Sequence, residues 1–144
     1  MTDSRLQTIT LCGSMQVLPQ FVYWKRKLKR AGYRVFLPTL VNYRLHYRST
    51  ERALHAKRKE NRRHFQKIKQ SDAILVLNYP TGKSLNHIGG STFGEIAVAF
   101  FMGKRIFLAN PIPRDSIFRE ELQAWGAETW EDLTRTSGKS KVNG

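Results

Sequence analysis

Two short apolar runs, separated by a longer segment, constrain the fold of this chain more than any other feature. Residues 73–77 read Ala-Ile-Leu-Val-Leu, and residues 106–109 read Ile-Phe-Leu-Ala. Runs without polar alternation are typical of strands that are buried on both faces of a parallel sheet. Parallel neighbours need a crossover connection, and the intervening segment is long enough to hold a loop and a helix. The region from 71 to 113 therefore predicts a strand–loop–helix–strand unit with a right-handed crossover.

The first part of the intervening segment has the composition of a loop. Residues 78–91 contain a proline together with several glycines and asparagines, which favour turns. The loop runs into the sequence Gly89-Gly90-Ser91-Thr92. Bare backbone amides and hydroxyl groups at such a turn suit a phosphate or a carboxylate. The alternative interpretation is an ordinary helix start with flexible glycines.

A helix is predicted to follow this turn. Ser91 or Thr92 is expected to cap it, because a side-chain oxygen can accept a hydrogen bond from the free amides of the first turn. Residues 96–101 are all apolar, which predicts a well-buried helix, and Gly103 is expected to end it. Glu95 is expected in the first helical turn, where the helix dipole favours a carboxylate.

Strand and helix signals alternate through the rest of the chain. This alternation predicts an α/β fold, a three-layer sandwich around a doubly wound, mostly parallel sheet of the flavodoxin- or Rossmann-like type. Residues 1–136 are expected to form this single domain, and residues 137–144 to be a disordered tail. The other predicted strands cover residues 8–12, 33–37 and 128–130, and the other predicted helices run from residue 16 or 19 to Gly32, from 50 to 70 and from 114 to 125.

Apolar stripes indicate which face of each helix packs against the sheet. Side chains three, four or seven positions apart lie on one helical face. The stripes expected to be buried are Phe21, Trp24 and Leu28 in the first helix, Leu54, Asn61, Phe65 and Ile68 in the second, and Ile117, Phe118 and Leu122 in the last.

The predicted topology brings several polar residues together. In a doubly wound sheet the first and third strands flank the point where the strand order reverses, and ligands bind at the carboxyl ends of these strands. Gly13 and Ser14 follow the first strand, Asn78 follows the third, and Glu95 lies beyond the next loop. We therefore expect these residues to converge on one crevice.

The chain is strongly basic, with 25 lysines and arginines, 11 acidic residues and a formal net charge of +14. The excess is concentrated between Lys25 and Lys69, and such a field attracts phosphate-bearing partners, including nucleic acid held non-specifically. Tyr43, His46 and Tyr47 lie among arginines there and could stack on bases. The alternatives are a solvated basic helix, or assistance in binding an anionic small substrate.

Several classes of protein find no support in the sequence. Cys12 is the single cysteine, and no histidine has a partner at helical ligand spacing, so we predict no disulfide framework and no metal. The phosphate-binding and dinucleotide-binding glycine motifs are absent, so we predict no cofactor. No apolar run could span a bilayer and the N-terminus has no signal-peptide core, so we expect a soluble, cytoplasmic protein without membrane contact.

Four sequence segments carry a resemblance to a known family. They are Leu11-Cys-Gly-Ser14, residues 71–78 (Ser-Asp-Ala-Ile-Leu-Val-Leu-Asn), residues 89–95 (Gly-Gly-Ser-Thr-Phe-Gly-Glu) and Gly103-Lys-Arg-Ile106. In order and spacing they resemble the nucleoside 2-deoxyribosyltransferase superfamily, which includes the 2'-deoxynucleoside 5'-monophosphate N-glycosidases. The resemblance covers residues 7–113.

The resemblance implies a nucleoside or nucleotide substrate and a homodimer or higher homo-oligomer. It implies that Glu95 is the nucleophile, which attacks the anomeric carbon and displaces the base, as the carboxylate of a retaining glycosidase does. The substrate-binding residues that follow from the motifs and the crevice are Gly13, Ser14, Asn78, Gly89, Gly90, Ser91 and Thr92. Among these, Gly13 and Ser14 would line the sugar or phosphate side, and Ser91 with the Gly90 amide would hold a 5'-phosphate.

One position departs from the family pattern. In the family, an aspartate that assists proton transfer stands eight residues before the aspartate that opens the third strand. Here Asp72 opens the strand and His64 stands eight residues earlier. A histidine can protonate a leaving base, so His64 is a catalytic candidate, and the alternative is a surface residue on a basic helix. Asp72 is expected to be structural, and Asn78 to contact a base edge or to turn the loop.

Three functional hypotheses follow. The leading one is an enzyme that cleaves or exchanges an N-glycosidic bond through Glu95. The second is a non-catalytic nucleotide-binding or sensing domain on the same fold, which would tolerate Glu95→Gln. The third is a nucleic-acid-binding protein that uses the basic region, whose affinity would fall steeply with salt. The base, the sugar and the acceptor are left open by the sequence.

Overall fold

The computed structural model describes residues 6–39, 51–82 and 85–131. Its centre is a five-stranded sheet with the strand order β2-β1-β3-β4-β5, and all four strand pairings are parallel. The strands are β1 (Thr8–Cys12), β2 (Arg34–Phe36), β3 (Ala73–Val76), β4 (Arg105–Leu108) and β5 (Glu128–Thr129). The helices are η1 (Met15–Val17), α1 (Leu18–Arg30), α3 (Glu51–Lys69), α4 (Gly90–Phe101) and α5 (Arg119–Ala124).

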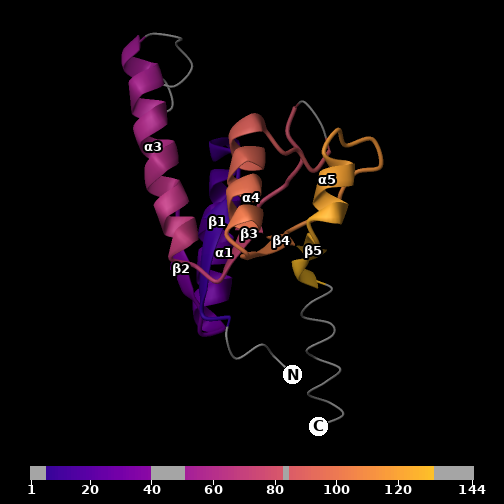
Figure 1. Cartoon of the computed structure of the whole chain (residues 1–144). Coiled ribbons are helices and arrows are strands. Elements are labelled where there is room, and N and C mark those ends of the chain that lie inside the picture. Colours follow the sequence, from indigo (N-terminus) through magenta and orange to yellow (C-terminus); the bar gives the residue numbers. More distant parts are fainter. Residues whose placement is uncertain (1–5, 40–50, 83–84, 132–144) are drawn as a thin grey trace, which may run out of the picture.

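Helices cover both faces of the sheet, which makes three layers (Figure 1). One apolar cluster joins α1 to the sheet through Phe21, Trp24 and Leu28, so the stripe predicted for this helix is confirmed. A second cluster joins α3, α4 and α5 to the opposite face. The strand order reverses between β1 and β3, as in the flavodoxin-like type of doubly wound sheet. The predicted fold class is therefore confirmed.

Side-chain alternation along β1 sorts residues between the two faces. Ile9 and Leu11 belong to the cluster under α1, whereas Cys12 belongs to the cluster under α3 and α4. Thr10 also lies in the interior, and its hydroxyl bonds to that of Ser71. Cys12, the last residue of β1, therefore faces the layer that contains α3 and α4.

The start of β3 is fixed to β1 by Asp72. One of its carboxylate oxygens accepts hydrogen bonds from the backbone amides of Gln7 and Thr8, each at 2.9 Å. The structural role expected for Asp72 is therefore confirmed, and this carboxylate is engaged far from the strand ends where ligands bind.

The buried stripe predicted for α3 is wrong at Leu54, which is 53% exposed. The buried residues of this helix are Ala53, His64 and Ile68, and Phe65 packs partly against the second cluster. The N-terminal part of α3 extends past the sheet, so its side chains have no sheet to cover (Figure 1). The expected alternative that His64 is a surface residue is also wrong, because its ring lies inside.

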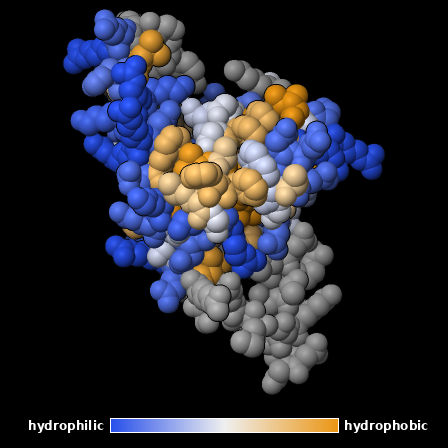
Figure 2. Space-filling view, viewed as in Figure 1, coloured by the Kyte–Doolittle hydropathy of each residue, from blue (hydrophilic) through white to orange (hydrophobic). Residues whose placement is uncertain are grey.

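Helix α4 is buried on one face only, which corrects the expectation of an all-round buried helix. Ile96 and Ala99 face the sheet, but Phe100 is half-exposed and Phe101 is 87% exposed. Figure 2 shows an apolar patch over the middle of the molecule, beside the hydrophilic flank formed by α3. An aromatic stack on the α4–α5 side includes Phe93, Phe118, Trp125 and Phe100.

The last predicted helix is shorter than expected. Residues 114–118 form turns, in which Ser116 donates its amide to Pro113 and accepts from the Phe118 amide. Ile117 is consequently 84% exposed rather than buried, whereas Leu122 lies in the core.

Some expectations fall outside the described residues. They concern the basic loop with Tyr43, His46 and Tyr47, and the tail over 137–144. Within the described residues, no helix combines the length and the apolar character needed to cross a bilayer.

Candidate functional site

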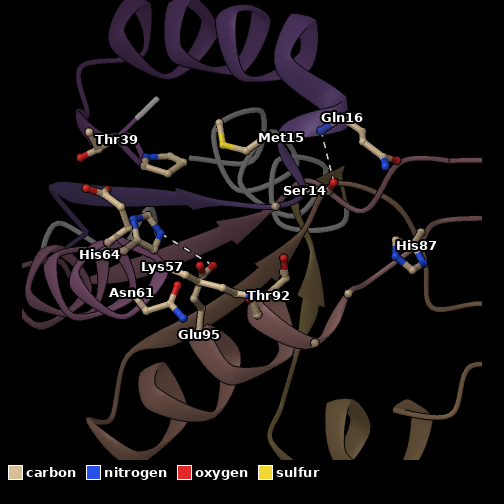
Figure 3. Close-up of a pocket in the computed structure, with 16 residues that line it drawn as sticks. Ser14, Met15, Gln16, Thr39, Lys57, Asn61, His64, His87, Thr92 and Glu95 are labelled. Carbon is tan, nitrogen blue, oxygen red and sulfur yellow. Dashed lines mark hydrogen bonds and ion pairs between the residues drawn. The ribbon is translucent and has the colours of Figure 1, made fainter. Parts of the chain in front are cut away.

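A cavity of about 460 Å³ opens at the carboxyl ends of β1 and β3, between α3 and the start of α4 (Figure 3). Small-molecule sites typically measure roughly 300–1,000 Å³. The lining residues are Gly13, Ser14, Met15, Gln16, Pro38, Thr39, Lys57, Glu60, Asn61, His64, His87, Gly89, Gly90, Ser91, Thr92 and Glu95.

The predicted convergence holds for most of the candidate residues. Gly13, Ser14, the turn from Gly89 to Thr92, His64 and Glu95 all line this cavity. The sequence did not predict that Lys57, Glu60 and Asn61, which lie on the same face of α3 as His64, also line the cavity. Their helical spacing is visible in the sequence, but only the packing of α3 shows that this face borders a cavity.

The loop after β1 approaches β3 closely at Gly13. A Cβ atom at this position would lie 3.2 Å from the Leu77 Cβ and 3.3 Å from the Leu77 carbonyl oxygen, so a larger residue would push the loop away. Ser14 begins the 3₁₀ turn η1, and its hydroxyl oxygen accepts from the Gln16 amide at 3.2 Å. On this side, the cavity wall is therefore shaped by the close approach of Gly13 to Leu77 and by Ser14, which caps η1.

The start of α4 differs from the sequence prediction. Gly89 is the N-cap residue and the helix begins at Gly90, so Ser91 and Thr92 lie within the first turn and do not cap it. The first amides of a helix have no partner within the helix. In α4 these are the amides of Gly90, Ser91 and Thr92, which line the cavity and could donate hydrogen bonds to an anion there.

Glu95 lies in the second turn of α4, not in the first as predicted, because the helix starts earlier than Ser91. Its side chain is only 12% exposed and points toward His64, with its Oε2 atom 3.7 Å from the His64 Nε2 atom (Figure 3). The same Nε2 atom lies 3.5 Å from the Cys12 Sγ atom. Neither the Oε2 atom of Glu95 nor the Nδ1 atom of His64 has a hydrogen-bond partner among the described residues.

Burial controls the protonation of this cluster. It raises the pKa of Glu95 to about 7, against a smaller opposing effect of the neighbouring Cys12 side chain. Burial, reinforced by the positive charge of Lys67, lowers the pKa of His64 to about 4. Burial and the nearby Glu95 carboxylate raise the pKa of the Cys12 thiol. Near pH 7 the imidazole is neutral and Glu95 is partly protonated, so their contact is a polar contact rather than an ion pair.

Asn78 does not line the cavity, although the topology suggested that it would. Its side chain is fully buried and holds Asn110, which follows β4. The Asn78 amide donates to the Asn110 carbonyl at 2.7 Å, and its oxygen accepts from the Asn110 backbone at 2.9 Å. The Asn110 side chain returns a bond to the Asn78 carbonyl at 3.1 Å. Asn78 was expected either to contact a base edge or to turn the loop, and these hydrogen bonds support the second role.

The structure also assembles three ligand types that sequence spacing did not connect. The Cys12 sulfur, a His64 ring nitrogen and a Glu95 oxygen all lie within 4.8 Å of one another. They come from β1, α3 and α4, so a search for histidines at helical spacing could not find them. These are the described residues that could hold a metal ion.

Two solved structures share the fold of this chain. A 2-deoxyribosyltransferase from Bacillus psychrosaccharolyticus has a TM-score of 0.50 and 16% identity, over 74% of this chain and 77% of the other. The CMP N-glycosidase BcmB from Clostridium botulinum has a TM-score of 0.50 and 16% identity, over 85% of each chain. No family model matches, and no curated protein matches. The resemblance to the 2-deoxyribosyltransferase-like group is therefore confirmed at the level of the fold.

Proposed function

We propose that this protein cleaves or exchanges the N-glycosidic bond of a nucleoside or nucleoside 5'-monophosphate, with Glu95 as the nucleophile. The observation that carries the proposal is the buried Glu95 carboxyl beside the His64 ring, in a cavity at the switch point of the sheet. The two enzymes that share the fold are named for acting on a deoxyribosyl group and on CMP, which favours this bond type over others.

The proposed first step couples proton transfer to attack. His64 Nε2 takes the proton of Glu95, and the carboxylate attacks the anomeric carbon, forming a glycosyl ester as the carbon–nitrogen bond breaks. The electron pair of that bond goes to the base, which receives the proton from the His64 imidazolium. The 3.7 Å between Glu95 Oε2 and His64 Nε2 closes to a hydrogen bond with a small side-chain movement.

The second step releases the enzyme. Water or a second base attacks the anomeric carbon, and the ester bond to Glu95 breaks with its electron pair returning to the carboxylate. His64 Nε2 takes the proton that the attacking molecule loses and returns it to Glu95, which restores the starting state. With water the outcome is hydrolysis, and with a second base it is exchange. Either acceptor must reach the cavity, which is open to solvent beside Gly90 and Ser91, two residues with exposed surface.

The start of α4 supports a phosphorylated substrate. The first-turn amides and the Ser91 hydroxyl offer donors to a 5'-phosphate, and Lys57 on the opposite wall adds positive charge. The net charge of +14 favours the approach of an anionic nucleotide over that of a neutral nucleoside.

The experiment is incubation of the purified protein with a panel of nucleosides and nucleoside 5'-monophosphates, with chromatographic detection of free base. Glu95→Ala is the inactive control. Glu60→Ala is the matched control, because Glu60 also lines the cavity but forms an ion pair with Arg63 at 3.2 Å. Release of one base by the wild type and Glu60→Ala, but not by Glu95→Ala, supports the proposal. Full activity of Glu95→Ala contradicts it.

The protonation of His64 favours a second candidate, a nucleotide-binding domain without turnover. An imidazole with a pKa of about 4 carries almost no proton of its own at pH 7, so the leaving base has no independent acid. This candidate predicts saturable nucleotide binding by calorimetry, no release of base from any substrate, and equal affinity in Glu95→Gln.

A further inference from the structure

We propose that Cys12, His64 and Glu95 form a binding site for a thiophilic divalent cation, with Zn²⁺ as the best fit. The three side chains come from the end of β1, the C-terminal half of α3 and the second turn of α4. His64 and Glu95 line the cavity, and Cys12 lies next to them, fully buried.

The distances already match those of a zinc site. Zinc binds thiolate sulfur at about 2.3 Å and imidazole nitrogen or carboxylate oxygen at about 2.0–2.2 Å, so tetrahedral ligand atoms are separated by about 3.5 Å. Here Cys12 Sγ lies 3.5 Å from His64 Nε2, which lies 3.7 Å from Glu95 Oε2. All three atoms fall within 4.8 Å of one another, so binding needs only small side-chain shifts.

The donor set selects the kind of cation. A thiolate, an imidazole and a carboxylate suit zinc and other borderline-soft ions, whereas Mg²⁺ and Ca²⁺ prefer oxygen ligands alone. Three protein ligands leave a fourth position, which here would face the cavity. Binding requires the Cys12 thiolate, so the thiol proton leaves to solvent as the cation enters.

A second observation points to a missing partner in this cluster. His64 is more than nine-tenths buried, and the buried Oε2 atom of Glu95 has no hydrogen-bond partner among the described residues. An unpartnered polar atom in the interior is unfavourable. A cation that binds Oε2, the His64 nitrogen and the Cys12 sulfur together would remove that deficit.

One consequence rests on the proposed function. A bound cation would occupy both Glu95 and His64, so the carboxylate could not attack a sugar and the imidazole could not carry a proton. Zn²⁺ and glycosyl transfer would then exclude each other, and zinc would act as a reversible inhibitor that a chelator removes.

The test is titration of the metal-free 144-residue chain with Zn²⁺ by calorimetry, and with Co²⁺ as a spectroscopic probe. We expect one ion per chain, together with the near-ultraviolet sulfur-to-cobalt band and the intense visible bands of a tetrahedral thiolate site. Cys12→Ser and His64→Ala should lose more than the roughly 10–100-fold in affinity that loss of an outer-shell partner costs. His55→Ala, an exposed histidine on the same helix, should bind as the wild type does.

The outcomes separate this inference from the proposed function. Absence of stoichiometric binding, or equal binding by Cys12→Ser with an unchanged circular dichroism spectrum, overturns the site. Zn²⁺ binding by a protein that releases no base from any substrate supports the site and contradicts the enzyme. Base release that is unaffected at saturating Zn²⁺ overturns the proposed ligand role of Glu95.

Discussion

Two buried polar groups lie at the same edge of the sheet and differ in how completely their atoms are bonded. The Asn78–Asn110 pair follows β3 and β4, and the two residues exchange three hydrogen bonds of 2.7–3.1 Å. The cluster of Cys12, His64 and Glu95 has contacts of 3.5 and 3.7 Å, and its His64 Nδ1 and Glu95 Oε2 atoms have no hydrogen-bond partner among the described residues.

The difference shows which group stabilises the fold and which is available for chemistry. Each hydrogen bond of a fully bonded buried pair stabilises the fold by about 0.5–1.5 kcal/mol, and breaking the pair costs more because the remaining partners are left unpaired. An incompletely bonded cluster already carries that unfavourable free energy in the folded state. Such a cluster, beside a cavity and with shifted pKa values, is the pattern expected at a functional site.

The largest expected effect is the separation of activity from stability in Glu95→Gln. Replacing a nucleophilic carboxylate by an amide should reduce base release by about 10⁴-fold or more. The melting temperature should stay equal or rise, because the variant no longer buries a group that ionises. Steady-state kinetics and thermal denaturation at pH 7.5 measure the two effects. A variant that loses both activity and stability would show that Glu95 belongs with the structural pair.

Asn78→Ala should show the opposite separation. Removing this side chain leaves the Asn110 amide and carbonyl without partners, so the free energy of unfolding should fall by about 3 kcal/mol. Urea denaturation measures this change. Asn61→Ala, an asparagine on the cavity wall, is the control and should change stability little. Equal stability of Asn78→Ala and the wild type would remove the contrast between the two groups.

The pH dependence of base release tests the proton path. If one proton must be shared by the Glu95–His64 pair, kcat/KM should fall as pH rises above about 7, where Glu95 loses that proton. His64→Ala should reduce base release at pH 6 by about 100-fold and reverse the profile, since the ionised carboxylate alone must then react. A wild-type profile that instead rises through pH 7 would exclude His64 as the proton carrier.

The smallest expected effect is on stability as a function of pH. Glu95 has a pKa raised from 4.5 to about 7, so its contribution is present below pH 4.5 and is lost as pH rises through 7. His64 has a pKa lowered from 6.5 to about 4, so its contribution is present above pH 6.5 and is lost as pH falls through 4.

Between pH 4.5 and 6.5 these two contributions oppose each other in the wild type, so this pair should leave stability nearly flat. In Glu95→Gln only the His64 contribution remains, and the free energy of unfolding should rise by on the order of 2 kcal/mol across that range. Urea denaturation at a series of pH values measures the difference. Parallel curves for the two proteins would contradict the shifted pKa of Glu95.

The sequence predicted the sheet well because its signals are local. Apolar runs place β3 and β4 to within one residue, and Gly103 follows the end of α4 with a φ of 72°, as a helix-ending glycine should. Leu54 was wrongly predicted to be buried, because apolar periodicity does not show where a helix extends beyond the sheet. Glu95 was placed one turn too early because Gly89, a weaker capping signal than serine, is the N-cap residue.

The site was predicted only in part because its chemistry depends on long-range contacts. The family resemblance pointed to Glu95, and to His64 as a departure from its pattern, but nothing local connects Cys12 to either, since Cys12 and His64 are 52 positions apart. The partner of Asn78 is similarly distant, at 32 residues. Whether a buried polar residue is fully bonded decides its role, and that property is absent from any single stretch of sequence.

The aromatic stack on the α4–α5 side gives the protein a built-in optical reporter. Trp24 and Trp130 contact each other in the cluster under α1, whereas Trp125 packs on Phe93 and Phe100 of α4. Phe93 is two residues from Glu95, so a shift of α4 on ligand or metal binding would change the surroundings of Trp125. Trp24 and Trp130 lie on the far face of the sheet, and their surroundings would stay the same. The emission of Trp125 therefore follows the site without any attached dye.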